Sequence, residues 1–400
     1  MNIHSVVNHI RHGTFRARTK EKIHEVISSW IRRYRRFFPI RDNRIVFDNF
    51  AGRGYADHPR YIAEEIHRRG LKWDIVWLVD NINEPMPDWI RKVRYRSWRS
   101  VYDLTTARYW VDNIRNAHLV PKKNGQVYLQ TWHGAMPFKK VEKEAENFLS
   151  PGYIKAAKYD GSIIDAIISP NHMQSQQFRE YFWLNENTEI LEVGSPRSDC
   201  LFNEKYIKET NKKIRGKLHI GLEDYVVLYA PTFRDDGNTE AYNMEFESVQ
   251  RAFSEKTGRV CRIIVRLHPN VYSKDLFSFD EWLLDGNMIQ DSTEIVICSD
   301  AVITDFSSIM YEAVLLKKIC FRYALDYEDY ISKRPLLPIE QEMPFLVSRS
   351  TKELVEDIMG TDYEEYQKVI KVFMNNMGLY ENGNAAKKVV DWLEQRQFGK

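Results

Sequence analysis

The chain has 400 residues, of which 43% are hydrophobic and 28% charged, and a formal net charge of +2. This length exceeds one ordinary core and suits two domains of about 150–200 residues each. The sequence contains no run of about 18 apolar residues, so it predicts no transmembrane helix, and we expect no cleavable secretory signal. The four cysteines are widely separated, which favours reduced core thiols, and no clustered ligands indicate a metal site.

The first 44 residues are strongly basic: they hold eleven Lys or Arg against three Asp or Glu, which leaves about −6 for the rest of the chain. Apolar residues recur at helical spacing from Ile23 to Phe38, a shorter copy of this pattern covers residues 3–10, and Pro39 ends the predicted helix. An apolar stripe with arginines on the other faces is typical of a helix that lies on an anionic membrane. The predicted membrane-binding residues are Trp30, Arg32, Arg33, Arg35, Arg36, Phe37 and Phe38.

Two alternatives exist for this basic arm. Its apolar stripe could instead pack on its own domain, with the arginines simply solvated. Nucleic-acid binding is not expected, because the arm has no aromatic RNA-binding strand and the rest of the chain is acidic.

After the arm, short apolar runs alternate with helical stretches, and this alternation predicts two parallel sheets covered by helices on both faces. Strands of the first sheet are expected at 45–50, 74–80, 109–113, 127–132, 166–169 and 190–193, and strands of the second at 226–229, 262–267, 295–298, 301–303 and 319–323. The fold class is therefore α/β, with two doubly wound Rossmann-type domains that face each other.

The predicted domain organisation follows the same pattern. It comprises amphipathic helices at 1–43, a first domain at 44–205, a second at 206–375 and a C-terminal helical segment at 376–400. The segment 194–221 is the best candidate for a linker. Packing of the C-terminal segment against the first domain is one possible arrangement.

Ligands of doubly wound domains bind beyond the carboxyl ends of the strands, and the first of four motifs at such ends is Trp132-His133-Gly134. A histidine at a strand end, followed by a glycine that leaves room for a ligand, is suited to act as a general base at neutral pH. A purely structural histidine is the alternative.

The other three motifs point to phosphate. Thr232 and Arg234 follow the strand at 226–229 and could donate to phosphate oxygens, or form a turn with a solvated Arg–Asp pair. Arg266 and His268, two residues apart at a strand end, suit a diphosphate, or a buried ion pair. The remaining motif contains Asp305, Ser307 and Ser308 before a helix, where free N–H groups and hydroxyls favour an anion, or where serine simply caps the helix.

In this order and at these intervals, the segments W-H-G, A-P-T-F-R-D, R-L-H-P and T-D-F-S-S resemble the motifs of the CDP-glycerol glycerophosphotransferase family. This family contains teichoic-acid primases and polymerases and relatives that build capsular polymers. The likeness extends from about residue 44 to residue 390, and it includes the segment I-V-F-D-N-F at 45–50. The resemblance implies a GT-B-like fold with an interdomain cleft, no required metal or cofactor, membrane attachment through N-terminal helices, and donor binding mainly in the second domain.

The resemblance also implies roles for individual residues. His133 matches the proposed base, with His268 as a second catalytic histidine. The residues that match the donor- and phosphate-binding positions are Thr232, Arg234, Arg266, His268, Asp305, Ser307 and Ser308. One departure is the loop after Gly134, which has one additional residue and lacks the threonine that is usual in the family. The identity of the family's acceptor is therefore not transferred to this chain.

The predicted function is that of a transferase at the cytoplasmic face of the cell membrane, peripherally bound. It would move glycerol phosphate from CDP-glycerol, or ribitol phosphate from CDP-ribitol, to a hydroxyl of a lipid-linked or polymeric glycan acceptor, and release CMP. The sequence leaves open the choice of alditol, primase or polymerase action, and teichoic acid or capsule as the product. The alternatives are a GT-B glycosyltransferase that uses a nucleotide sugar and a non-catalytic, membrane-bound anion-binding protein.

Overall fold

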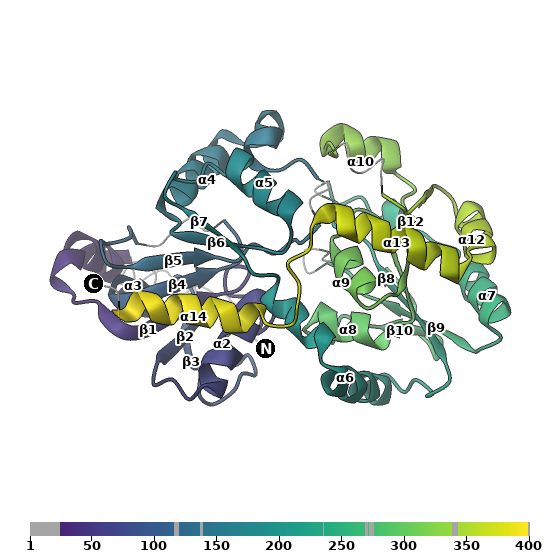
Figure 1. Cartoon of the computed structure of the whole chain (residues 1–400), viewed down its shortest axis with the longest axis horizontal. Coiled ribbons are helices and arrows are strands. Elements are labelled where there is room, and N and C mark those ends of the chain that lie inside the picture. Colours follow the sequence, from purple (N-terminus) through teal and green to yellow (C-terminus); the bar gives the residue numbers. More distant parts are fainter. Residues whose placement is uncertain are drawn as a thin grey trace, which may run out of the picture.

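The computed structural model describes residues 25–115, 120–136, 139–234, 236–268, 271, 276–337 and 343–398, with side chains up to residue 396. Two parallel sheets lie in two lobes, and helices flank both (Figure 1). The first sheet has the order β3 (Arg91–Arg94), β2 (Asp74–Val79), β1 (Arg41–Asp48), β4 (Ala107–Asp112), β5 (Val127–Gln130), β6 (Ala166–Ser169), β7 (Glu189–Glu192). The second has the order β10 (Leu283–Asp285), β9 (Cys261–Val265), β8 (Tyr225–Ala230), β11 (Ala301–Thr304), β12 (Ile319–Tyr323), β13 (Val347–Ser348).

The strands of the first sheet are apolar on both faces because both faces are covered. Phe47 belongs to the core shared with α2 (Asp57–Arg68) and α14 (Ala385–Phe398), whereas its neighbour Val46 faces α3 (Trp98–Thr106) and α5 (His172–Tyr181). Val46 lies opposite Val76 of β2 and Trp110 of β4 in the parallel register. Alternate side chains of a strand point to opposite faces, so two buried faces produce a continuous apolar run.

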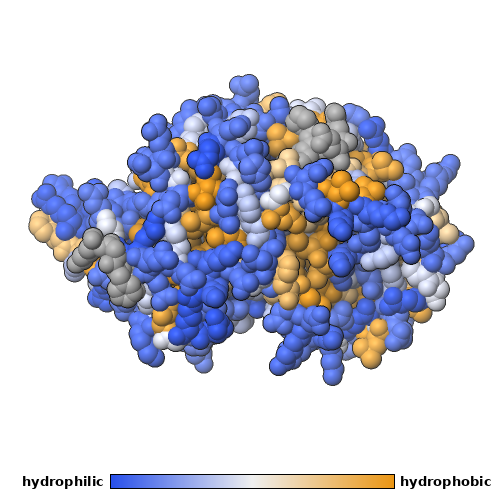
Figure 2. Space-filling model, viewed as in Figure 1, coloured by the Kyte–Doolittle hydropathy of each residue, from blue (hydrophilic) through white to orange (hydrophobic). Residues whose placement is uncertain are grey.

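The second sheet is built in the same way. One face packs against α6 (Glu204–Lys217), α8 (Ser292–Cys298), α9 (Ile309–Leu315), α10 (Tyr327–Lys333) and α13 (Tyr363–Met377). The other packs against α7 (Phe246–Thr257) and α12 (Thr351–Gly360). The surface in the view of Figure 1 is mostly hydrophilic, with apolar side chains in patches between the helices (Figure 2). The predicted pair of doubly wound α/β domains is therefore confirmed.

The chain passes between the two domains twice. The first crossing runs from β7 through the short helix η3 (Pro196–Phe202) to α6. The second returns from α13 to α14, whose residues Val389, Val390 and Leu393 are completely buried in the core of the first domain. On this return, Tyr380 N donates to Pro170 O at 2.9 Å. The segment between α13 and α14 is therefore bound to the first domain before α14 begins.

Two sequence predictions were wrong. The segment 295–298 was predicted as a strand but forms the end of α8, which Asp291 begins by accepting a hydrogen bond from Thr293 N at 3.0 Å. A short helix that is buried on all sides gives the same apolar run as a buried strand. The predicted linker 194–221 was too long, because it contains η3 and the 14 residues of α6.

The basic arm is described only from residue 25, and the pattern predicted at 3–10 lies outside the described residues. Residues 25–33 are helical and η1 (Arg35–Phe37) follows. Ile31 is 3% exposed and Phe38 packs against Tyr102 at a ring distance of 5.8 Å, whereas Trp30 and Phe37 are 56% and 67% exposed. The apolar stripe therefore splits into a side packed on the first domain, which includes Phe38, and a side exposed to solvent.

Within the described ranges, the helices are too short or too polar to cross a bilayer. The remaining helical segments are α4 (Pro151–Ile163), η2 (Glu142–Phe148) and η4 (Glu240–Tyr242). All four cysteines are buried and unpaired.

Candidate active site

His133 lies just beyond the carboxyl end of β5 and is held in one tautomer. Its Nδ1 is 2.6 Å from the carbonyl oxygen of Asn113. A carbonyl can only accept, so Nδ1 carries the proton and donates it, and Nε2 is left as the acceptor. Burial lowers the pKa of His133 below its usual value of 6.5. The imidazole is therefore neutral at pH 7, with Nε2 able to take a proton.

The turn that carries His133 is set by its neighbours. Trp132 has φ +55°, in the left-handed region, which turns the chain sharply at the end of β5. The imidazole then contacts the rings of Trp132 and Phe50, at centroid distances of 4.4 and 5.5 Å. These contacts fix the ring in position.

Asn113 is the centre of the polar contacts behind His133. Its side-chain amide donates to Asn49 Oδ1 at 2.8 Å and to Asp57 Oδ2 at 3.3 Å, and its Oδ1 accepts from Phe50 N at 2.9 Å. The turns after β1 and β4 and the start of α2 are thereby tied to the carbonyl that orients His133. Asn113 was not predicted as a site residue, although its position at the end of the predicted strand 109–113 was a usable signal.

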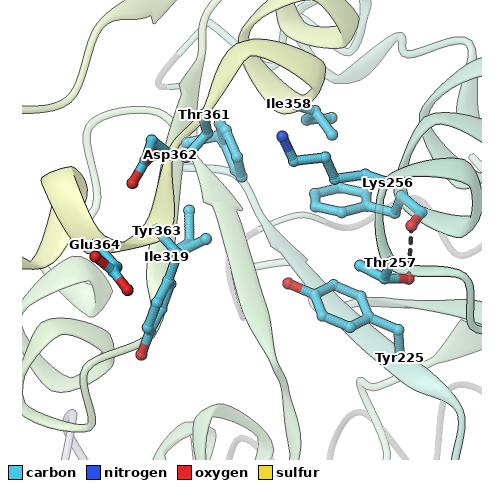
Figure 3. Close-up of a pocket in the computed structure, with 11 residues that line it drawn as sticks. Tyr225, Lys256, Thr257, Ile319, Ile358, Thr361, Asp362, Tyr363 and Glu364 are labelled. Atoms are coloured by element: carbon cyan, nitrogen blue, oxygen red, sulfur yellow. Dashed lines mark hydrogen bonds between the residues drawn. The ribbon is translucent and has the colours of Figure 1, made fainter.

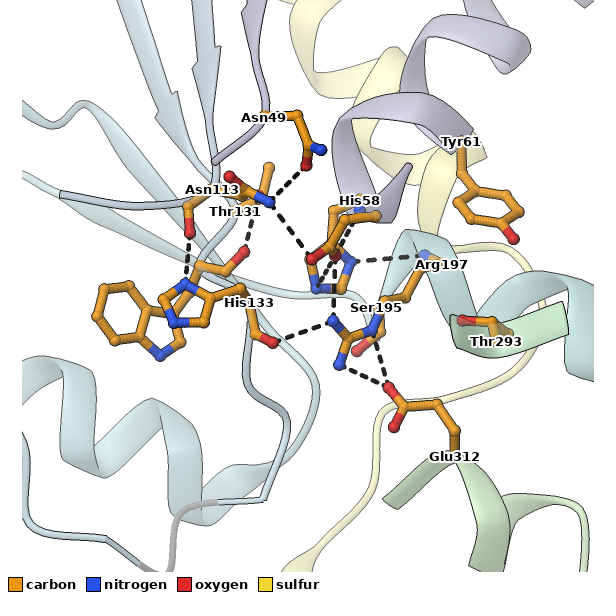
Figure 4. Close-up of polar contacts among 12 residues, drawn as sticks. Asn49, His58, Tyr61, Asn113, Thr131, His133, Ser195, Arg197, Thr293 and Glu312 are labelled. Carbon is orange, nitrogen blue, oxygen red and sulfur yellow. Dashed lines mark hydrogen bonds and ion pairs between the residues drawn. The ribbon is translucent and has the colours of Figure 1, made fainter. Parts of the chain in front are cut away.

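Arg197 joins this group to the second domain (Figure 4). Its Nη1 donates to Asp57 Oδ1 at 3.1 Å and to the carbonyl oxygen of His133 at 3.0 Å. Its Nε donates to Glu312 Oε1 of α9 at 2.8 Å, and Nη2 lies 2.6 Å from the same oxygen. Arg197 was not predicted as a site residue because it lies in the segment predicted as a linker, although it too follows a strand end, that of β7.

On the second domain, Thr232, Arg234 and Asp305 bind one another. Asp305 accepts hydrogen bonds from Thr232 N at 2.8 Å, from the Thr232 hydroxyl and from Phe306 N, and its other oxygen is 2.9 Å from Arg234 Nη1. Arg234 also forms a two-pronged pair with Asp326, at 2.6 and 2.8 Å. The structure thus places these three predicted phosphate ligands in a buried cluster that joins the loops after β8 and β11.

Arg266 is likewise engaged with its own domain. Its guanidinium donates to the carbonyls of Gly286 at 3.1 Å, Gln290 at 3.0 Å and Ile289. Because β9 ends at Val265, the alternation that put Arg266 and His268 on one face does not continue beyond the strand. Arg266 fixes the loop at 286–290.

His268 lies close to positive groups from both domains. Its ring stacks on Phe233 at a centroid distance of 5.7 Å. Desolvation, and then the charges of Arg53 and Lys139 and the fields of His133 and Arg334, lower the pKa of His268 to about 4. The two histidines therefore lie near each other although they belong to different domains. The three cationic side chains around His268 (Arg53, Lys139 and Arg334) are called the cationic cluster below.

Ser307 and Ser308 form the turn that leads into α9, and both are partly exposed. Ser307 Oγ accepts a hydrogen bond from Ile309 N at 3.3 Å. A Cβ on Gly134 would stand 3.8 Å from Ser308 Oγ. The loop after His133 and the serine turn are therefore immediate neighbours, and the carboxyl ends of β5 and β11 meet at this point.

A separate cavity of about 530 Å³ lies elsewhere in the second domain (Figure 3). Tyr225 and Ile319, which begin β8 and β12, line it together with Lys256 and Tyr363. It thus opens at the amino ends of the strands, whereas His133 and the serine turn lie at carboxyl ends. Within the described ranges, we found no three His, Cys, Asp or Glu side chains grouped so that they could hold a metal ion.

Known proteins are similar to this chain in both sequence and fold. The chain is 28% identical over 369 residues to the teichoic acid poly(glycerol phosphate) polymerase of Staphylococcus epidermidis, covering 89% of this chain and 51% of that protein. It is 29% identical over 370 residues to the polymerase of the same name from Bacillus spizizenii, covering 89% of this chain and 93% of that protein. The chain thus spans about half the length of the first relative and nearly all of the second.

Among solved structures, the chain is similar to a variant of the wall teichoic acid polymerase TagF soaked with CDPG. The TM-score is 0.82 at 26% identity, and the likeness covers 99% of this chain and 98% of that chain. The sequence model of the CDP-glycerol:poly(glycerophosphate) glycerophosphotransferases matches residues 31–395. With nine-tenths of its length inside that match, and with both sheets and the paired strand ends in place, the chain belongs to this family.

Proposed function

We propose that the protein transfers an alditol phosphate from a CDP-linked donor to an acceptor hydroxyl and releases CMP. The observation that carries this proposal is the placement of His133, with Nε2 as the acceptor, beside the turn of Ser307 and Ser308 on the other domain. A base on one side and phosphate-binding groups on the other are what transfer of a phosphate to a hydroxyl requires. CDP-glycerol is the first donor to test, because it gives the family its name, and CDP-ribitol is the second.

The second domain would hold the donor. The serine hydroxyls and the N–H groups that open α9 are suited to phosphate oxygens, and the cationic cluster supplies positive charge from both domains. With a pKa of about 4, His268 is neutral at pH 7, so it would donate a hydrogen bond to the diphosphate through a ring N–H. Thr232, Arg234, Arg266 and Asp305 would act indirectly, by holding the loops that carry these groups.

The reaction then needs one proton transfer and one displacement. The acceptor O–H gives its proton to Nε2 of His133, and its oxygen forms a bond to the distal phosphorus of the diphosphate. The bond from that phosphorus to the bridging oxygen breaks, and CMP leaves with the electron pair. Positive groups around the diphosphate stabilise the charge that develops on its oxygens.

The acceptor would be a hydroxyl of a lipid-linked or polymeric glycan, as in teichoic acid or capsule synthesis, and the protein would work at the cytoplasmic face of the membrane. The exposed side of the basic arm supports this. Trp30 and Phe37 project into solvent and Arg32, Arg33 and Arg36 are exposed beside them, while Arg35 is half-buried. Aromatic side chains next to arginines suit the headgroup layer of an anionic bilayer, where each cation contributes about 1 kcal/mol.

The test is CMP release from CDP-glycerol and CDP-ribitol with a short acceptor, with nucleotide sugars as comparison donors. His133→Ala should lower the rate by about 10²–10⁴-fold, the contribution of a general base, while CDP-glycerol still binds. His67→Ala, an exposed histidine stacked on Trp89, is the matched control and should keep the rate. Full turnover by His133→Ala would refute the assignment of the base, and release of UDP but not CMP would refute the donor class.

A further inference from the structure

We propose that Arg197 is a positioning residue that holds the His133 loop at a fixed distance from the serine turn; this inference rests on the proposed function. Arg197 lies in η3, where the chain first crosses between the domains. One guanidinium group there contacts Asp57 and the His133 carbonyl of the first domain and Glu312 of the second. No role for this residue follows from the four motifs.

The contacts reach both halves of the candidate site by short paths. On one side, Arg197 Nη1 donates to the carbonyl of the base residue itself, at 3.0 Å. On the other, Glu312 belongs to α9 and lies one turn beyond Ser308, so its contact with Arg197 ties Arg197 to the helix that follows the serine turn. Arg197 therefore links the loop of the base directly to the helix that follows the serine turn.

Burial makes this arrangement sensitive to geometry. The side chains of Arg197, Asp57 and Glu312 are 12%, 7% and 4% exposed. Buried ions are tolerated only when they are paired with good geometry, and apolar residues of similar volume often stabilise a fold equally well. Stability alone therefore does not explain a buried cation between two carboxylates, whereas a requirement for a fixed geometry does.

Arginine is needed here because its donors are fixed in one plane. Nε and Nη2 face Glu312 while Nη1 faces Asp57 and the His133 carbonyl. Lysine would keep the charge but, as a point charge on a flexible stem, cannot hold three acceptors in this geometry. The substitution Arg197→Lys thus separates charge from positioning.

A second contact between the domains provides the matched control. Arg60 Nη1 lies 3.0 Å from Asp291 Oδ2, so Arg60 joins α2 to the start of α8. Its side chain is 16% exposed, close to the value for Arg197. Its contacts are with Glu64, Asp291 and Glu294 and with the rings of Tyr55 and Tyr61. Arg60→Lys therefore perturbs the interface between the domains away from the base.

The experiment measures CMP release, KM for CDP-glycerol and melting temperature for both variants. We expect Arg197→Lys to lower kcat by about 10²-fold, the usual effect of a misplacement of about 1 Å, with KM within about threefold of wild type. Arg60→Lys should keep kcat within about twofold. In Arg197→Met, loss of the charge removes one cause of the lowered pKa of His133, so the acid limb of the kcat profile should move to higher pH.

Glu312→Gln tests whether the effect passes through α9. If it does, combining it with Arg197→Lys should lower kcat by less than the product of the two separate effects. Wild-type kcat in a folded Arg197→Lys protein, or equal losses in Arg197→Lys and Arg60→Lys, would overturn the positioning role alone. Absence of CMP release by the wild-type protein would overturn the proposed function, and this inference with it.

Discussion

Replacing Asp305 by alanine separates a structural role for the buried cluster of the second domain from a role in binding phosphate. Asp305 is 1% exposed and accepts three hydrogen bonds from Thr232 and Phe306. Removal of the Asp305 carboxylate also breaks its ion pair with Arg234, which keeps Asp326 as its remaining carboxylate partner. Breaking a buried pair of this kind costs about 3–5 kcal/mol. For a domain of this size, we expect the melting temperature to fall by about 10 °C.

Thermal unfolding followed by circular dichroism measures this loss, and titration with CDP-glycerol measures donor binding. Ser307→Ala is the matched control: the Ser307 hydroxyl makes one long contact, at 3.3 Å, so its loss should weaken donor binding and leave the melting temperature within about 1–2 °C. If Asp305→Ala melts with the wild type and yet loses donor binding, Asp305 contacts the donor, and the structural role assigned to Thr232 and Arg234 is wrong.

The remaining predictions concern pH and the membrane. Because burial lowers the pKa of His133 below 6.5, the pH at which kcat is half-maximal should lie below 6.5; half-maximal kcat above pH 7 would contradict this. Burial raises the pKa of Glu381 to about 7, so the folded state binds this proton more tightly than the unfolded chain. Stability should therefore fall by about 3 kcal/mol as pH rises from about 4.5 to 7, and Glu381→Gln should flatten that slope in urea titrations. Combining Trp30→Ala with Phe37→Ala should weaken binding to anionic vesicles by tenfold or more without changing the melting temperature. Phe38→Ala should instead lower the melting temperature and leave vesicle binding unchanged, because Phe38 packs on Tyr102. Vesicle binding by the Trp30→Ala, Phe37→Ala protein equal to that of the wild type would count against a membrane-bound arm.

Much of the fold could be predicted because local pattern and tertiary environment agree. Residues 45–48 are apolar or buried in succession because both faces of the first sheet are covered. The same reasoning failed at 295–298, where a helix is buried on all sides. It also missed β3, β10 and β13, because these are short edge strands, and β3 has the sequence Arg-Lys-Val-Arg. Edge strands do not need an apolar run on both faces.

The site was predictable to the extent that it follows single strand ends. For His133 and for the serine turn, residue type and position after a strand were enough to predict a site. Asn113 and Arg197 act through contacts with segments 20 and 64 residues away from them, and no local pattern encodes such partners. Arg266 was assigned to a ligand because a long side chain at a strand end can point to the cleft or to backbone carbonyls of its own domain, and only the three-dimensional arrangement decides between them.

The position of α14 has a consequence for the order in which the protein folds during synthesis. This helix supplies part of the core on one face of the first sheet, against α2, and Asp199 caps it by accepting from Ala385 N and Ala386 N at 2.8 and 2.7 Å. The first domain leaves the ribosome early, but that face stays open until residues 385–396 have been translated. The second domain, encoded in between, can complete its own core up to α13 beforehand. The half of the molecule that is made first is thus the half that is finished last.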